Sequence, residues 1–188
     1  MKNKNLLTII LIFNIIALLL IITNRLETSI IKWIILTIPL FIPMTLKNLK
    51  ISINNTIEKM YLILIFLSST LGRIYRLYYI TNWYDTLVHG ISGILLFTLG
   101  QIILKHYKLN KNILFNILFG ITLTLSLGTI WELTEYNSDE IFNTNMQSRE
   151  TGVKDTIKDL SIAGTTCLVT SFIYLKKQMK LDNKHDVF

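Results

Sequence analysis

Long apolar stretches separated by short polar segments make up most of the chain. A membrane-spanning α-helix needs about 20 mostly apolar residues. The pattern therefore predicts an all-α fold, a polytopic membrane helical bundle of six transmembrane helices that forms one integral membrane domain over residues 1–188. The predicted helices cover approximately residues 6–23, 29–46, 58–80, 86–104, 113–133 and 157–175.

The second predicted helix contains two prolines, Pro39 and Pro43. Proline lacks a backbone N–H and its ring clashes with the preceding turn, so it interrupts an α-helix. We therefore expect this helix to be the least regular of the six.

Composition supports the membrane class. Of the residues, 51% are hydrophobic and 16% are charged, whereas a soluble domain carries roughly 25% charged residues. The net charge is +7, but the basic residues flank apolar segments instead of forming one stripe. This arrangement is typical of topology-determining charges. It excludes nucleic acid as the expected partner and predicts a multi-pass protein of the cell membrane.

Basic residues are distributed unequally between the two sides of the predicted bundle. Twelve lie on the side of the two termini and five on the other side. Because Lys and Arg are enriched in cytoplasmic loops, both termini are predicted to be cytoplasmic. The twelve are Lys2, Lys4, Lys47, Lys50, Lys59, Lys105, Lys108, Lys111, Lys176, Lys177, Lys180 and Lys184, and the five are Arg25, Lys32, Arg149, Lys154 and Lys158.

Three pairs of ionisable residues share helical spacing at the predicted outer ends of three helices. Residues three or four positions apart lie on the same face of a helix. With both termini in the cytoplasm, the fourth and sixth helices begin at the outer side of the membrane and the fifth helix ends there. The three pairs are therefore expected at the same depth in the membrane, near its outer surface. The pairs are Asp85 with His89, Glu132 with Glu135, and Asp155 with Asp159.

Small or polar residues continue on the same faces of these three helices. Small side chains let membrane helices approach closely, so we expect the three faces to pack on one another. These residues are Ser92, Gly93, Gly100, Gly128, Ala163, Thr166 and Thr170.

Five carboxylates and one imidazole at one level need charge compensation, because neighbouring acids cannot all stay ionised. A divalent cation is the simplest compensation, and carboxylates with imidazole on facing helices are how bundle metal sites are built. The six paired residues are therefore candidate metal ligands, and Glu135 and His89 are the candidate catalytic groups. The ligand types suit Zn²⁺, Mn²⁺, Fe or Mg²⁺ and leave the identity of the metal open.

Other charged residues have two interpretations. Arg73 and Arg76 lie near the outer end of the third predicted helix and are candidate ligands of a substrate phosphate. Alternatively, they extend to the interface among neighbouring aromatic residues. Asp139, Glu140 and Glu150 are expected to be solvated in an outer loop.

The paired residues resemble motifs of the YjdF-type inner-membrane proteins. Asp85-x-x-x-His89 with Gly93 resembles the first motif, Trp131-Glu132-x-x-Glu135-Tyr136 the second, and Gly152-x-x-Asp155-x-x-x-Asp159 with Gly164 the third. Gly90 and Val153 depart from the family pattern, which has an aromatic and often an acid at these places. A looser similarity to VanZ-like proteins implies action at the outer leaflet on envelope or lipid-linked material. The YjdF-type family implies no established activity.

Three functions are compatible with these features. The first is a metal-dependent membrane hydrolase or transferase acting on a lipid or lipid-linked substrate at the extracytoplasmic face. The second is a protein that binds or transports cations or protons, although the apolar inner halves of the fourth and sixth helices argue against a polar pathway. The third is an immunity or scaffold protein whose acids are separated or pair with bases. Membrane lipids are the expected surroundings, and the sequence does not predict the oligomeric state.

Overall fold

The computed structural model describes residues 3–50, 54–109, 112–142, 146–147 and 152–185. These residues form helices and contain no strand, which confirms the all-α class. The chain divides into two compact units, Met1–Val88 and His89–Phe188, and each is described by itself. The prediction of a single domain stays a prediction. Lys2, Lys111, Arg149 and Glu150 lie outside the described residues.

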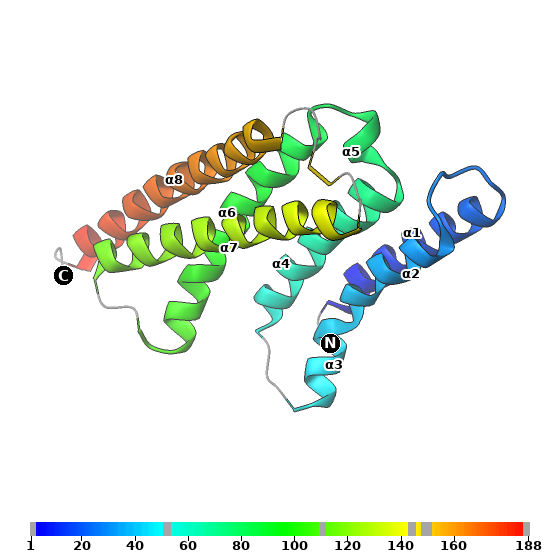
Figure 1. Cartoon of the computed structure of the whole chain (residues 1–188). Coiled ribbons are helices and arrows are strands. Elements are labelled where there is room, and N and C mark those ends of the chain that lie inside the picture. The colour runs from blue at the N-terminus through cyan, green and yellow to red at the C-terminus, as the bar shows by residue number, and fades with distance from the viewer. Residues whose placement is uncertain (1–2, 51–53, 110–111, 143–145, 148–151, 186–188) are drawn as a thin grey trace. The chain divides into compact units, whose positions relative to one another are not determined.

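The first unit begins with two apolar helical stretches that lie side by side (Figure 1). Pro39 and Pro43 are the second residues of η1 and α3, where the α-helix changes to a 3-10 helix and then continues as an α-helix. The interruption agrees with the irregularity expected from the two prolines. The elements are α1 (Lys4–Ile22), α2 (Ile30–Thr37), η1 (Ile38–Phe41) and α3 (Ile42–Asn48).

The next helical stretch differs from the continuous helix predicted over 58–80. Helix α4 (Asn55–Ile65) runs into a π-helix, η2 (Phe66–Ile74), and the short α5 (Leu77–Ile80) follows. Arg76 adopts the left-handed conformation between η2 and α5, with φ of 64°. A left-handed residue stops helix propagation, so η2 ends before α5 and Arg73 lies in the last turn of η2.

Asn14 is the centre of a buried polar network in the first unit. Its side-chain Nδ2 donates to Thr70 Oγ1 at 3.1 Å, and its Oδ1 accepts from Thr37 Oγ1 at 3.2 Å. The indole Nε1 of Trp33 donates to the Asn14 carbonyl at 3.0 Å. The network therefore joins α1, α2 and η2 through hydrogen bonds that satisfy one another's polar groups.

The second unit contains three long helices. Helix α7 extends nine residues beyond the predicted end at 133, so Glu135, Asp139 and Glu140 are helical. The Asp139 carboxylate accepts the backbone N–H groups of Met146 and Gln147 at 2.7 and 2.8 Å, which differs from the solvated role expected for it. The helices are α6 (Tyr84–His106), α7 (Ile113–Phe142) and α8 (Gly152–His185), and the unit boundary falls inside α6.

Small residues bring the three helices together, as the sequence predicts. A Cβ added to Gly93 of α6 would collide with the Ala163 carbonyl oxygen and the Thr166 hydroxyl of α8. A Cβ on Gly100 would lie 3.1 Å from the Cα of Gly120 on α7. Glycine is thus required where α6 meets α8, because backbone atoms fill the space that a side chain would need.

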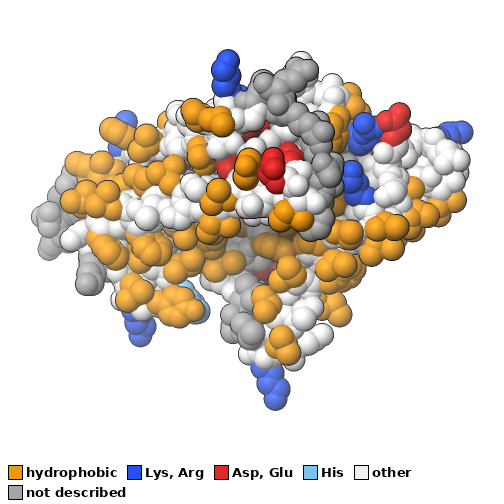
Figure 2. Space-filling view, in the orientation of Figure 1, with side chains coloured by type: hydrophobic (Ala, Val, Ile, Leu, Met, Phe, Trp, Pro, Cys, Tyr) orange, Lys and Arg blue, Asp and Glu red, His pale blue; other side chains and the backbone are white. Residues whose placement is uncertain are grey.

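Four helical stretches are long and apolar enough to cross a membrane: Lys4–Ile22, Ile30–Asn48, Tyr84–His106 and Ile113–Ile141. The third and sixth predicted spans fall on α4–η2 and α8, which are also helical. Six spans with cytoplasmic termini remain a prediction. Hydrophobic side chains cover much of the visible surface (Figure 2), as expected where helices face lipid.

Candidate functional site

Three buried ionisable side chains, one from each long helix, meet in the second unit. His89 lies on α6, Glu132 on α7 and Asp159 on α8. Their exposed fractions are 9%, 3% and 3%. Acidic residues are almost never this buried unless they are paired or bind a cation.

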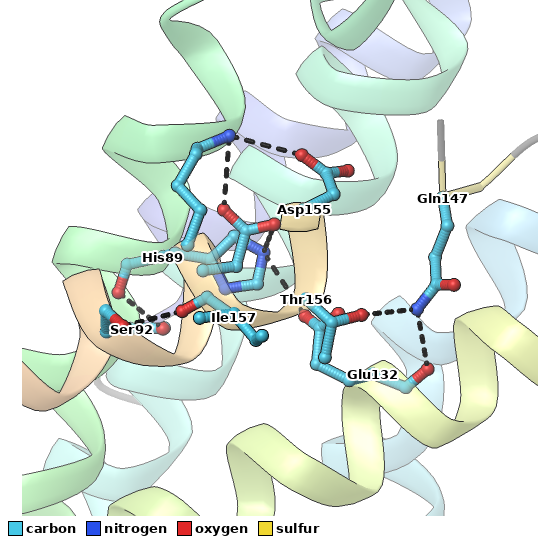
Figure 3. Close-up of polar contacts among 10 residues, drawn as sticks. His89, Ser92, Glu132, Gln147, Asp155, Thr156 and Ile157 are labelled. Carbon is cyan, nitrogen blue, oxygen red and sulfur yellow. Dashed lines mark hydrogen bonds and ion pairs between the residues drawn. The ribbon is translucent and has the colours of Figure 1, made fainter. Parts of the chain in front are cut away.

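The imidazole of His89 lies between the two carboxylates (Figure 3). Its Nε2 is 3.8 Å from Glu132 Oε1 and 4.0 Å from Asp159 Oδ2. These separations exceed those of hydrogen bonds. Two ligands at about 2.1 Å from a tetrahedral metal ion lie roughly 3.4 Å apart. The separations of His89 Nε2 from the two carboxylates are therefore a few tenths of an ångström wider than that ligand spacing.

Asp85 is carried one turn before His89 on the same continuous helix, α6. One ligand atom each of Asp85, His89 and Asp159 lies within 4.8 Å of the others. Asp85, His89 and Asp159 thus form one group of close ligand atoms, and Glu132 lies beside the imidazole of that group. This proximity differs from the separated acids of the scaffold interpretation, whereas its alternative, acids that pair with bases, stays open.

Lys158 provides a positive charge at the edge of the cluster. Its Nζ is 3.4 Å from Asp159 Oδ1 and 3.3 Å from Asp155 Oδ1. The lysine side chain is 43% exposed, whereas that of Asp159 is 4% exposed. Asp155, a predicted metal ligand, is therefore an ion-pair partner of Lys158 in this structure.

A glutamine amide supports the α7 and α8 sides of the cluster (Figure 3). Gln147 Nε2 donates to Thr156 Oγ1 at 2.8 Å and to the Glu132 carbonyl at 3.4 Å. Because the Asp139 carboxylate holds the backbone N–H of Gln147, the connection after α7 is tied to the helices that carry the acids. Gln147 was not among the residues selected from the sequence. Those residues are ionisable pairs three or four positions apart within a helix, and Gln147 lies between α7 and α8.

Glu135 lies further along α7, and the two arginines belong to the first unit. Glu135 is half-buried on α7, three residues after Glu132. In the first unit, Arg73 lies over the Tyr78 ring, with its guanidinium carbon 5.7 Å from the ring centroid. Arg76 forms an ion pair with Glu27. The phosphate-binding role of both arginines stays a prediction.

A cavity of about 210 Å³ adjoins the cluster between α7 and α8. Glu132 forms part of its wall, and Leu133, Tyr136, Val153 and Leu160 contribute apolar surface. The cavity would therefore accept an apolar group beside a buried carboxylate.

The comparison with known families identifies the wider group of proteins. A family described as "Predicted membrane protein (DUF2238)" matches residues 5–178, nearly the whole chain. The chain belongs to this family. DUF2238 is the family of the YjdF-type proteins, so the resemblance stated from the three motifs is confirmed. Membership agrees with a multi-pass membrane protein and brings no known activity.

No curated protein and no solved structure matches the chain. The looser similarity to VanZ-like proteins therefore stays a prediction. Within this DUF2238 member, the three motifs lie at the start of α6, within α7 and at the start of α8. These are the segments that carry the buried cluster.

Proposed function

We propose that this protein is a metal-dependent membrane enzyme, a hydrolase or transferase that acts on a lipid or lipid-linked substrate at the extracytoplasmic face. The observation that carries the proposal is the buried set of His89, Glu132 and Asp159, supplied by three helices around one imidazole edge. Asp85 adds a fourth ligand from the same helix as His89.

Charge favours a divalent cation in this cluster. Glu132, Asp159 and Asp85 supply three carboxylates, and Lys158 contacts Asp159 from the edge. Two positive charges held among carboxylates and an imidazole offset the cost of burying the acids. Such a cation would lower the pKa of a bound water, which makes the water a nucleophile near neutral pH. Glu135, one turn along α7, is the proposed general base.

The cavity supports a lipid-like substrate. Its walls are mostly apolar and Glu132 reaches it, so an acyl or isoprenoid chain would place its polar end next to the cluster. Leu133 and Val153, which line the cavity, are 54% and 74% exposed, so a molecule could enter it sideways from the bilayer. The extracytoplasmic location rests on the charge bias of the predicted loops.

Metal content is the first test. Purified protein in nanodiscs should bind one of Mn²⁺, Zn²⁺, Fe²⁺ or Mg²⁺, measured by elemental analysis and calorimetry. His89→Ala and Glu132→Gln should weaken binding at least about 100-fold, because each removes a ligand from a buried site. Glu140→Gln is the matched control, since this α7 acid is exposed. Chelation should lower the stability by about 2.7 kcal/mol when metal had been present at about 100 times its Kd.

Substrate turnover is the second test. The loaded protein is incubated with a total lipid extract, and lipids consumed or formed are identified by mass spectrometry. The Glu135→Gln variant should bind the metal but lose turnover, because it lacks the base and keeps the ligands. Absence of bound metal would refute the proposal. Bound metal with metal uptake into proteoliposomes and no lipid turnover would instead support the transport interpretation.

A further inference from the structure

Lys158 is placed to act on the cluster and not only to set topology. It stands three residues after Asp155 and directly before Asp159 on α8. Its ammonium group lies between their carboxylates, at 3.3 Å from Asp155 and 3.4 Å from Asp159. One positive charge is thus shared by a carboxylate that belongs to the cluster and one at its edge.

The two acids differ in burial, which gives the lysine two unequal positions. The side chain of Asp159 is 4% exposed and that of Asp155 is 25% exposed. A charge that neutralises Asp159 removes the larger desolvation penalty, because Asp159 has less water around it. A lysine that leaves Asp159 can stay with Asp155 without entering a less polar environment, since its own side chain is 43% exposed.

We propose that Lys158 is a built-in counter-ion of the site that a divalent cation must displace, and that Asp155 retains the lysine once the cation is bound. The inference rests on the proposed function, because it concerns the occupancy of the same site. In the empty site the ammonium group partly neutralises Asp159. When a divalent cation binds Asp159, it repels the ammonium group, which moves fully to Asp155.

This arrangement makes the site selective for charge. A monovalent cation offers Asp159 no more charge than the lysine already provides, whereas a divalent cation offers twice as much. Lys158 therefore competes with cations for Asp159 and lowers the affinity of the site for monovalent cations more than for divalent ones. Asp155 is a positioning residue for Lys158 and not a metal ligand.

The test is the dissociation constant for Mn²⁺ alone, measured by electron paramagnetic resonance on the full-length protein in nanodiscs at one pH. Lys158→Gln should bind Mn²⁺ about tenfold more tightly, equivalent to about 1.4 kcal/mol. Asp155→Asn should bind it several-fold more weakly, because the lysine then loses the carboxylate that would retain it away from Asp159. Lys158→Arg retains the positive charge and should resemble the wild type.

Lys154→Gln is the matched control. It removes the same charge from the same helix, four residues earlier, at an exposed position. Equal tightening in Lys154→Gln and Lys158→Gln would show a general charge effect and overturn the inference, as would an unchanged affinity in Lys158→Gln. If neither the wild type nor Lys158→Gln binds Mn²⁺ or any other divalent cation, the proposed function fails as well. Binding by Lys158→Gln but not by the wild type would support the inference in its strongest form.

Discussion

Glu58 in the first unit and Asp159 in the second are both almost completely buried carboxylates in contact with a lysine. Lys47 Nζ lies 2.6 Å from Glu58 Oε1, and Asn3 Nδ2 donates to Glu58 Oε2 at 3.1 Å. Each oxygen of Glu58 therefore has its own donor. The lysine also comes from the last turn of α3 and the acid from the first turn of α4, where the helix dipoles favour these charges.

Asp159 has a different environment. Its lysine is shared with Asp155, and its other oxygen faces the imidazole that also faces Glu132. Among the described residues, Glu58 has a lysine in close contact at 2.6 Å, whereas Asp155 and Asp159 share Lys158 at 3.3 and 3.4 Å. The comparison shows that burial alone does not mark a functional site. A lysine shared by two carboxylates is instead the feature that the proposed cation site would use, because a bound cation would add charge compensation there.

Neutralising the two acids should affect the free energy of unfolding differently. Glu58→Gln should lower the free energy of unfolding by about 2–3 kcal/mol, because it leaves Lys47 without its buried partner. Asp159→Asn should not lower it in chelated protein, since this change reduces the excess of negative charge. Thermal unfolding of both variants in detergent with a chelator measures the difference. A loss of similar size in both variants would mean that the acids of the second unit are structural as well.

Gly93 tests how the cluster is held in place. Gly93→Ala should destabilise the protein by about 1–3 kcal/mol, because the new methyl group collides with the Ala163 carbonyl, which cannot move by rotamer change. It should also weaken Mn²⁺ binding by separating α6 from α8. Gly90→Ala is the control, since a Cβ there meets Ile162 and Thr166 methyl groups at 3.7 Å, an ordinary contact. Unchanged Mn²⁺ binding in Gly93→Ala would show that the cluster tolerates this separation.

The smallest expected effect concerns the first unit. Thr37→Val removes the hydrogen bond to Asn14 Oδ1 and should cost about 0.6 kcal/mol, an average value for such bonds between membrane helices. Mn²⁺ binding should stay the same. Thr45→Val removes a bond of Thr45 to its own helix only and serves as the control in the same assay. A change in Mn²⁺ affinity in Thr37→Val would contradict the view that the Asn14 network is structural and that only the cluster of the second unit binds the ion.

Much of the helical layout could be predicted from the apolar runs. Helix α1 and helix α6 begin and end within two residues of their predicted ranges, because long apolar runs bounded by polar residues leave little choice. The break at Arg76 could not be predicted in this way. A left-handed non-glycine residue is decided by tertiary contacts, here the ion pair with Glu27 and the stacking of the guanidinium on Tyr79.

The candidate site was predicted in part. The helical spacing of Asp85 and His89 was sufficient to place them on one face. Glu132 and Glu135 show the limit of the rule, because a step of three residues turns the helix by about 300°, so the two side chains diverge by about 60°. Lys158 stands three residues after Asp155, so the same spacing rule links these two, but it does not link Lys158 to the adjacent Asp159. The importance of Lys158 was missed because a lysine near a membrane also has a simpler explanation as a topology signal.

The contact at Gly93 has a consequence for the range of ions that the site would accept. Because a Cβ on Gly93 of α6 would collide with a carbonyl of α8, the two helices already lie about as close as their backbones allow at this point. His89 and Asp159 are therefore carried on a frame of nearly constant width. A site of constant width distinguishes ions by radius, and the larger Ca²⁺, which prefers six to eight oxygen ligands, would fit less well than smaller divalent ions. The lack of a side chain at Gly93 of α6 would thus determine which ion radius suits the site that α6 and α8 form together.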